Sequence, residues 1–354
     1  MSYTAVQFIG YELFTGPGQY PKRHYVGLDS DREDIAARVA LFKEALIAAK
    51  NSPMVDNGSN VLKIFMAPEF YFRGARGAYP LDLLNSGGAD DRGLVGALTD
   101  LIKGSEWADW LVVFGTIIGR SSGGRGRNEV YNVALVQQGS FTKDTRLDKC
   151  VVIMKEFMSD IDFLDIAPGG LTLEQVSHLP AMAPGTYALE QNNPGQGGTG
   201  GYNGGSIFML NGITFGLEVC LDHLARRLLR AWPLAGDLFV QVQLIPSGGM
   251  SIETGAVATQ TGGLVFNVDG LTSDRPDEGY GYHAALKHVR QRLPNDDQLR
   301  DALVLGIEPV NLNLNEVIRL FWLPPYNDVE DPTAHNPQLI FYKSVNIPAP
   351  EQAD

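Results

Sequence analysis

The sequence predicts an α/β fold built as a single domain. Segments with the apolar pattern of buried strands alternate with segments of helical periodicity through much of the chain, which is typical of this class. The 354 residues are 44% hydrophobic and 19% charged, the composition of a globular chain with a sizeable core. No linker rich in Pro and Ser divides the sequence. We expect one domain over 1–270 and an extension over 271–354 that packs on it or on a neighbouring subunit.

The expected helices carry apolar residues that recur at helical spacing. The clearest is 31–50, in which Phe42 and Leu46 belong to an apolar stripe, and Ser30 or a neighbouring aspartate stands before the first turn as a cap. The other expected helices span 94–102, 224–232 and 282–293.

The expected strands are short apolar runs bounded by turn residues. The run 110–118 is mostly apolar, so both faces of this strand are predicted to be buried. Asn211-Gly212 predicts a tight hairpin turn between strands 206–210 and 213–219. The remaining strands are expected at 3–9, 61–67, 130–137, 150–155, 238–245, 263–268 and 338–345.

Charge and cysteine content limit the classes of partner. The net charge of −13 argues against a nucleic-acid backbone or an anionic membrane surface as partner. No apolar run reaches the ~18 residues of a membrane span, and the first fourteen residues lack the pattern of a signal peptide. Cys150 and Cys220 are too few for a disulfide framework and fit a reducing compartment. We therefore expect a cytoplasmic protein that acts on small molecules.

Cys220 is the first of three residues with catalytic chemistry at the end of a predicted strand. It follows strand 213–219 and opens a helix. The positive end of a helix favours a thiolate, and its free N–H groups can hold an oxyanion. The simpler interpretation is a small buried apolar residue, which is the commoner fate of a free cysteine.

Glu69 and Lys155 also follow predicted strands. Glu69 directly after a buried strand suits a general base, or else a helix cap or an ion pair. Lys155 can polarise a carbonyl oxygen or simply end a strand in solvent, and Lys149 is a competing candidate. Because functional groups gather at the carboxyl ends of strands in α/β sheets, we expect Glu69, Lys155 and Cys220 to converge.

This ordered set resembles the nitrilase, or carbon–nitrogen hydrolase, superfamily. Pro68-Glu69-Phe70 resembles the family's Glu motif, with Ala67 where Phe is usual. The strand 132–136 (NVALV) resembles the strand before the family's Lys, and 155–162 (KEFMSDID) is similar to the Lys segment of omega-amidase-like members, with Phe157 in place of His. This alignment selects Lys155 over Lys149. The segment 216–222 (GLEVCLD) is similar to the family's cysteine turn.

The resemblance, which covers roughly residues 3–270, implies a fold and a division of roles. The fold is a four-layer α-β-β-α sandwich. Glu69 is the base, Cys220 the nucleophile, and Lys155 with the Leu221 N–H the oxyanion-binding group, while Glu174 falls where the family has a second, supporting glutamate. The family uses no cofactor and commonly forms homodimers or higher oligomers through helices next to the nucleophile.

The resemblance also bears on the substrate. Nitrilases of the family usually have Cys-Trp-Glu at the turn where this chain has Cys220-Leu221-Asp222, which favours a small amide or N-carbamoyl compound and leaves a nitrile as the alternative. Residues near the three catalytic candidates are expected to bind substrate, with Arg73 suited to a carboxylate. These residues are Tyr71, Phe72, Arg73, His223 and Ser247.

Two rival functions remain open from the sequence. His223, three residues after Cys220, allows a Cys–His dyad of the kind found in thiol proteases and acyltransferases. A chain with this fold and no activity is an inactive binding scaffold, which a fully buried Cys220 without an adjoining cavity favours.

Other polar groups have simpler interpretations. His283 and His288 are five residues apart, lie on different faces of the expected helix and predict no metal site. The arginines of 226–230 predict a solvent-exposed helix face. The segment 192–205 holds seven glycines and predicts either a lid over the pocket or an ordinary surface loop.

Overall fold

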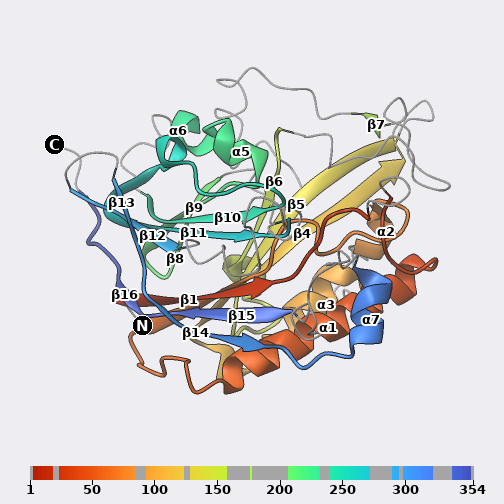
Figure 1. Cartoon of the computed structure of the whole chain (residues 1–354), viewed down its shortest axis with the longest axis horizontal. Helices are drawn as coiled ribbons and strands as arrows, with labels where there is room; N and C mark the ends of the chain where they lie inside the picture. Colours follow the sequence, from red (N-terminus) through yellow and green to blue (C-terminus); the bar gives the residue numbers. More distant parts are fainter. Residues whose placement is uncertain are drawn as a thin grey trace, which may run out of the picture.

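Two β-sheets pack face to face, and helices cover their outer faces (Figure 1). The computed structural model describes residues 3–18, 24–84, 93–122, 128–157, 176–177, 206–231, 240–271, 289–294, 298–321 and 337–351. The expected loop 192–205, Glu174, His283 and His288 lie outside these ranges.

The first sheet is built around three parallel strands, β1, β2 and β4, with antiparallel neighbours on both sides. The short strands β16 (Val345–Asn346), β3 (Tyr79–Pro80) and β7 (Val176–Ser177) pair with β1, β4 and β5. The order of the others is β14 (Val304–Pro309), β15 (Gln338–Tyr342), β1 (Ala5–Glu12), β2 (Val61–Met66), β4 (Trp110–Ser122), β5 (Asn128–Gln138) and β6 (Cys150–Met154).

The second sheet has parallel β9, β10 and β11 at its centre and antiparallel strands at its edges. Its hairpin β8–β9 turns at Asn211 and Gly212, which both adopt positive φ as a two-residue turn of this type requires, so the predicted hairpin is confirmed. The order is β13 (Leu299–Asp301), β12 (Val289–Arg292), β11 (Thr259–Asp269), β10 (Val240–Ser247), β9 (Ile213–Leu217) and β8 (Ile207–Leu210).

The inner faces of the two sheets form one continuous apolar core. Phe8 of β1 and Phe266 of β11 meet across the interface with ring centroids 4.9 Å apart. Both rings are fully buried, together with Ile64 and Leu244. Strands between two apolar layers have no face in water, which explains why the runs in the sequence are continuous rather than alternating.

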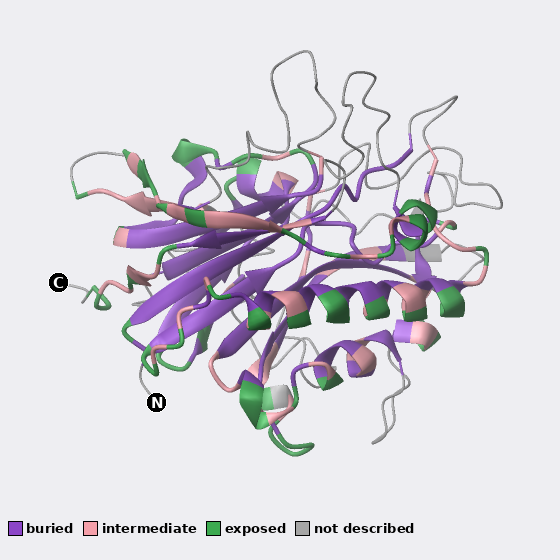
Figure 2. Ribbon diagram, turned by 60° about the horizontal axis from the view of Figure 1, so that its bottom comes forward, coloured by how far each residue is buried: buried purple, intermediate pink, exposed green. Residues whose placement is uncertain are grey.

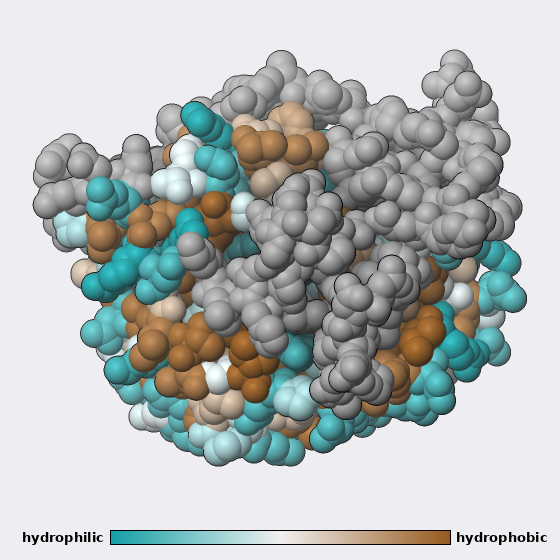
Figure 3. Space-filling view, in the orientation of Figure 1, coloured by the Kyte–Doolittle hydropathy of each residue, from teal (hydrophilic) through white to brown (hydrophobic). Residues whose placement is uncertain are grey.

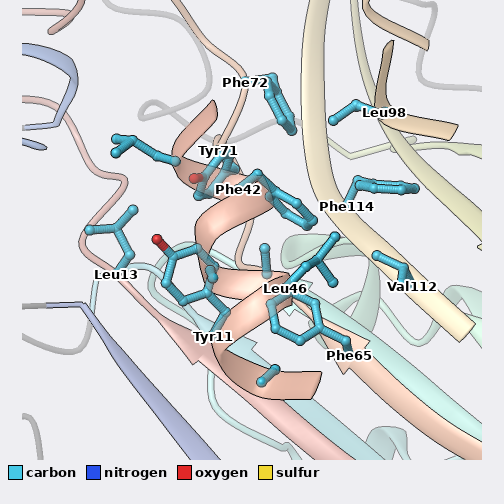
Figure 4. Packing of buried hydrophobic residues seen from close by; sticks show 14 of the residues in the cluster. Tyr11, Leu13, Phe42, Leu46, Phe65, Tyr71, Phe72, Leu98, Val112 and Phe114 are labelled. Carbon is cyan, nitrogen blue, oxygen red and sulfur yellow. The ribbon is translucent and has the colours of Figure 1, made fainter. Parts of the chain in front are cut away.

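A second core lies between the first sheet and its helices, α1 (Asp31–Asn51), α2 (Leu81–Leu84), α3 (Leu94–Asp100) and α7 (Leu314–Leu320). Phe42 of α1 stands at its centre, with Tyr71, Phe72 and Phe114 around it (Figure 4). Ser30 caps α1 by accepting from the Glu33 N–H, as the sequence predicts. Figure 2 shows buried strands beside a helix whose outward side is exposed.

The outer face of the second sheet carries two short helices, α5 (Leu221–Leu224) and α6 (Arg227–Ala231). Leu228 of α6 packs on Val240 of β10. The expected helix 224–232 is thus split, because Arg226 has a φ of 58° that no right-handed helix accommodates. The order helix, sheet, sheet, helix confirms the predicted α/β four-layer sandwich.

The chain beyond residue 270 differs most from the sequence prediction. The expected helix 282–293 is wrong over Val289–Arg292, which forms β12 and pairs antiparallel with β11. Helix α7 was not anticipated, although Asn313 caps it and Val317 and Leu320 form its buried side. Strands from this part join both sheets, and the division at residue 270 stays a prediction. Short 3₁₀ turns occur at Ser105–Trp107, Leu147–Lys149 and Thr254–Ala256.

The surface is mixed in character. On the face of Figure 3, hydrophilic side chains surround hydrophobic patches. Exposed leucines include Leu303, next to edge strand β14, and Leu305 within it. Within the described ranges no helix combines the length and the apolar composition needed to cross a membrane.

Candidate active site

Glu69, Lys155 and Asn132 form a buried polar cluster, in which Glu69 follows β2, Lys155 follows β6 and Asn132 lies within β5. Lys155 Nζ lies 2.9 Å from Glu69 Oε1, and Asn132 Nδ2 donates to the same oxygen at 2.8 Å. The Lys155 and Glu69 side chains have no exposed surface. Removing one partner of a buried ion pair leaves the other charge buried without compensation and strongly destabilises the folded protein. Each of the two charges is therefore stable in the interior only while the other is present. The cluster therefore offers a carboxylate whose one oxygen is fixed by two donors.

The backbone around Glu69 is fixed by contacts from both sheets. The Glu69 N–H donates to the Ser247 carbonyl at 3.2 Å, and the Thr15 hydroxyl donates to the Glu69 carbonyl. Phe70 has a φ of 63°, unusual for an aromatic residue, and its N–H donates to Thr116 Oγ1 at 2.8 Å. This reversal of the chain directs Glu69 between the sheets.

Gly115 allows the chain to turn back at this point. It has a φ of 69° at a bulge in β4, and a Cβ there would stand 2.2 Å from the Pro68 carbonyl oxygen. Only a glycine permits β4 to approach the Pro68-Glu69 peptide so closely, so the position of Glu69 depends on a neighbouring strand as well as on its own.

Cys220 approaches the cluster from the second sheet. It lies three residues beyond β9, with a φ of 48°, and its N–H donates to the Pro246 carbonyl at 3.1 Å. Its Sγ is 3.7 Å from the Gly248 carbonyl oxygen, and a Cβ on Gly248 would lie 3.2 Å from Glu69 Oε2. Cysteine and glutamate therefore face the same glycine. Lys155 thus contacts Glu69 directly, and Cys220 lies against the glycine that Glu69 also approaches, while a shared catalytic role for the three residues stays a prediction.

The helix after Cys220 is shorter than expected. Cys220 is the N-cap of α5, which has four residues, so a helix dipole contributes little there and the first-turn N–H groups are the main feature. The His223 N–H is engaged with the Cys220 carbonyl at 2.8 Å. An oxyanion contact from the Leu221 N–H stays a prediction.

Asp222 joins the turn at Cys220 to the segment after Lys155 (Figure 1, α5 beside β6). Its carboxylate accepts from the Glu156 N–H at 3.1 and 3.0 Å and from the Phe157 N–H at 2.7 Å. Arg227 NH1 donates to it at 3.1 Å, and Arg227 Nε lies 3.2 Å from Glu156. Burial raises the pKa of Asp222 to about 6, against the opposing effects of Arg227 and the two N–H groups. Arg227 is 3% exposed, so an exposed arginine face is wrong at this position.

His223 is committed to another buried network. Its Nδ1 is 2.8 Å from Glu218 Oε2, and its Nε2 accepts from the Glu253 N–H at 3.0 Å. Gln243 also donates to Glu218, at 2.8 Å. With both ring nitrogens engaged this way, Nδ1 carries the proton and Nε2 the lone pair. A Cys–His dyad requires one ring nitrogen to hydrogen-bond to the Cys220 thiol, whereas both nitrogens of His223 bind Glu218 and Glu253 here.

Two of the expected substrate-binding residues border the cluster. Ser247 is buried, its Oγ donates to the Met250 carbonyl at 2.8 Å, and Asn267 donates to it at 2.8 Å. Arg73 stacks on Phe70 with its Cζ 4.0 Å from the ring centroid, while Lys155 Nζ lies 5.7 Å from the same centroid. Arg73 lines a small cleft with Thr15 and Phe70.

Tyr71 and Phe72 are not part of this cluster. Both are fully buried in the core between the first sheet and α1, where their ring centroids lie 5.2 and 6.0 Å from that of Phe42. Their side chains fill the helix-side core because the chain reverses at Phe70. Lys149 is also elsewhere, with its Nζ 2.6 Å from the Ser140 carbonyl oxygen, so the structure brings Lys155 and not Lys149 to Glu69.

Two residues of the site were missed as side chains in the sequence. In the sequence, Asn132 stands out only as part of a strand motif, and Asp222 only as part of the cysteine turn. A signal existed for Asn132, since an amide that interrupts an apolar strand requires a buried partner. No group of three metal-ligand side chains occurs in the described part of the chain.

Comparisons with known proteins gave structural matches only. No family model matches the chain, and no curated protein matches it. An amidase from Nesterenkonia sp. matches with 11% identity over 76% of this chain and 77% of that one, at a TM-score of 0.36. A cysteine variant of Nesterenkonia AN1 amidase, described as from the nitrilase superfamily, matches with 13% identity over 76% and 77%, at 0.35. A double variant of the amidase from Nesterenkonia sp. AN1 in complex with acrylamide matches with 12% identity over 75% and 76%, at 0.36.

Proposed function

We propose that this protein is a thiol hydrolase of the nitrilase superfamily that cleaves the C–N bond of a small amide or N-carbamoyl compound. The observation that carries the proposal is the meeting of Glu69, held by Lys155 and Asn132, with Cys220 at Gly248. A thiol, a carboxylate and an ammonium group between two sheets are the parts that acyl transfer through a thioester requires.

In the first half-reaction Cys220 attacks the carbonyl carbon of the amide. Glu69 takes the thiol proton as the S–C bond forms, and the carbonyl electron pair moves to the oxygen, where Lys155 Nζ and the Leu221 N–H hold the negative charge. The C=O bond then re-forms, the C–N bond breaks, and Glu69 gives its proton to the departing nitrogen. The products are a thioester on Cys220 and ammonia or an amine.

In the second half-reaction water takes the place of the amine. Glu69 removes a proton from the water as its oxygen bonds to the thioester carbon, and Lys155 again holds the oxyanion. Collapse breaks the C–S bond, and the thiolate recovers the proton from Glu69. The acid is released with its own C=O group intact, and no redox partner is needed.

An amide is favoured over a nitrile by the residues at the cysteine turn, where Leu221 and Asp222 stand in place of the Trp and Glu usual in nitrilases. Arg73, 4.0 Å from the ring centroid of Phe70, is the proposed group for a substrate carboxylate. Glu174 remains the proposed supporting glutamate. Arg73→Gln is expected to raise KM for N-carbamoyl amino acids and to leave KM for simple amides unchanged.

The function is tested with a panel of short amides, N-carbamoyl amino acids and nitriles scored for ammonia release. Cys220→Ala is expected to abolish turnover, with an unchanged circular dichroism spectrum and melting temperature. Amide hydrolysis that survives in this variant overturns the nucleophile assignment. Acrylamide or iodoacetamide followed by peptide mass analysis is expected to modify Cys220 in the native protein.

Cys150 provides the matched control for this labelling. Burial raises the pKa of Cys150 to about 11, so at pH 8 its thiol stays protonated and reacts slowly. Cys150→Ser is expected to keep both the labelling and the activity, while Cys220→Ser loses the labelling. Both cysteines are free, and a nucleophilic thiol is preserved in a reducing compartment, which makes the cytoplasm the proposed location.

An inactive binding scaffold is the second candidate, because Cys220 is only 4% exposed. A scaffold predicts no ammonia from any member of the panel and no labelling of Cys220 until the protein unfolds. A hydrolase releases ammonia from a member of the panel and is labelled at Cys220 while the protein is folded. The homo-oligomer implied by the family resemblance is a separate proposal, tested by the mass of the native protein in solution.

A further inference from the structure

We propose that Asp222 is a positioning residue of this reaction, whose carboxylate holds the segment after Lys155 against the turn that bears Cys220. The inference rests on the proposed function and adds a residue that takes no part in bond making. Asp222 is two residues from the nucleophile, and the N–H groups it binds belong to the two residues after Lys155. Asp222 therefore links the segment that follows Lys155 to the turn that contains Cys220.

The connection crosses between the two sheets. Lys155 follows β6 at the margin of the first sheet, whereas Cys220 follows β9 in the second. Apolar packing between sheets fixes their separation but sets the position of a strand end less precisely than directed hydrogen bonds do. The three N–H contacts to Asp222, at 2.7–3.1 Å, supply that direction at the site itself.

Arg227 completes the arrangement on the side of α6. It contacts Asp222 through NH1 and Glu156 through Nε, so one guanidinium joins the carboxylate to the segment that the carboxylate binds. Lys155 is the other cation whose charge acts on Asp222. A carboxylate with no exposed surface is expensive to keep ionised, and burial raises its pKa to about 6. Ordinary packing at this position does not require a charge.

Asp222→Asn is the decisive variant because it keeps the shape and reverses part of the hydrogen bonding. One oxygen becomes an NH₂ group that faces N–H donors, so at least one contact is replaced by a donor–donor clash. A displacement of reacting groups by about 1 Å lowers the rate on the order of 100-fold. We expect kcat to fall by about this factor, with KM within about threefold of the original.

Two further measurements separate positioning from folding. The amide hydrogens of Glu156 and Phe157 are expected to exchange faster in Asp222→Asn than in the wild type. The fall of kcat on the acid side of the wild-type pH profile, near pH 6, is expected to be absent from the profile of the variant. Asp301→Asn, which removes the partner of Arg290 in an exposed pair, is the control and is expected to change none of these. If Asp222→Asn does not fold, Arg227→Lys removes the forked contact and keeps the charge, with a smaller loss of kcat expected.

The outcomes are distinct. A folded Asp222→Asn variant that retains kcat within threefold overturns the positioning role, as do unchanged exchange rates at Glu156 and Phe157. A wild-type protein with no activity and no labelling of Cys220 overturns the proposed function instead, and the exchange rates then report on the contact alone.

Discussion

Lys155 Nζ lies 2.9 Å from Glu69 Oε1, and 86 residues of chain separate the two side chains. The ammonium and the carboxylate are both buried, and the amide of Asn132 shares the same carboxylate oxygen. Such a pair is held in place by three strands of one sheet, and Cys220 is brought to it by the other sheet.

Glu69→Gln tests the carboxylate. Loss of a general base is expected to lower kcat by about 10²–10⁴-fold. The variant also leaves the Lys155 ammonium buried without its partner, which lowers the free energy of unfolding by about 3–5 kcal/mol. Steady-state kinetics and urea denaturation measure the two effects. Glu316→Gln, an exposed residue of α7, is the control, and equal losses in both variants would contradict the assignment.

Asn132→Ala tests the amide that fixes the Glu69 oxygen. A hydrogen bond to a charged group contributes about 1.5–3 kcal/mol, so kcat is expected to fall by roughly 10- to 100-fold. Asn132→Gln keeps the amide but moves it by one methylene and is expected to recover little activity. Unchanged kcat in the folded alanine variant would show that Lys155 alone orients the carboxylate.

His223→Asn distinguishes the proposed mechanism from a Cys–His dyad. The substitution breaks the contacts with Glu218 and the Glu253 N–H, so a lower melting temperature is expected. Activity per folded molecule is expected to change only modestly, because neither nitrogen of His223 serves Cys220. Near-complete loss of activity in a His223→Asn variant that is fully folded would support the Cys–His dyad instead.

The pH dependence of stability tests Asp222. Its pKa is raised by burial from 3.8 to about 6, so the native state keeps a proton that the unfolded chain releases between these values. The free energy of unfolding of the wild type, relative to Asp222→Asn, is therefore expected to fall as the pH rises from about 4 to 6, by an amount on the order of 3 kcal/mol. Denaturation of both variants across pH 4–8 measures it, and a difference that rises with pH contradicts the burial of the charge.

Phe72→Leu tests the place of the aromatic pair after Glu69. Its ring packs on Phe42 and Tyr71 in the helix-side core, so a stability loss of about 1–2 kcal/mol is expected, with KM unchanged. A clear rise in KM without loss of stability would return Phe72 to the substrate pocket.

Local pattern predicted those parts of the fold whose signals are themselves local. The cap at Ser30, the helix after it and the turn at Asn211-Gly212 depend on neighbouring residues, and the structure contains them. The predicted helix is wrong over 289–292 for the opposite reason. Its conformation is set by pairing with β11, a partner that periodicity cannot detect.

The same division applies to the site. Glu69, Lys155 and Cys220 are candidates from the sequence because each follows a predicted strand and strand ends converge in an α/β sheet, and their catalytic roles stay a prediction. The side chains of Tyr71 and Phe72 were assigned to the wrong side because the reversal at Phe70 depends on Thr116 and Gly115 in another strand.

The amino-acid order by itself determined which segments form strands and helices and which three reactive groups stand at their ends, because periodicity and turn chemistry are properties of neighbours in the chain. Tertiary structure alone decided that Asn132 joins Lys155 on Glu69, that Asp222 reaches across to the segment after Lys155, and that His223 turns away to Glu218. A buried polar group is stable only where it has a hydrogen-bond partner, and in these cases the partner comes from a distant part of the chain.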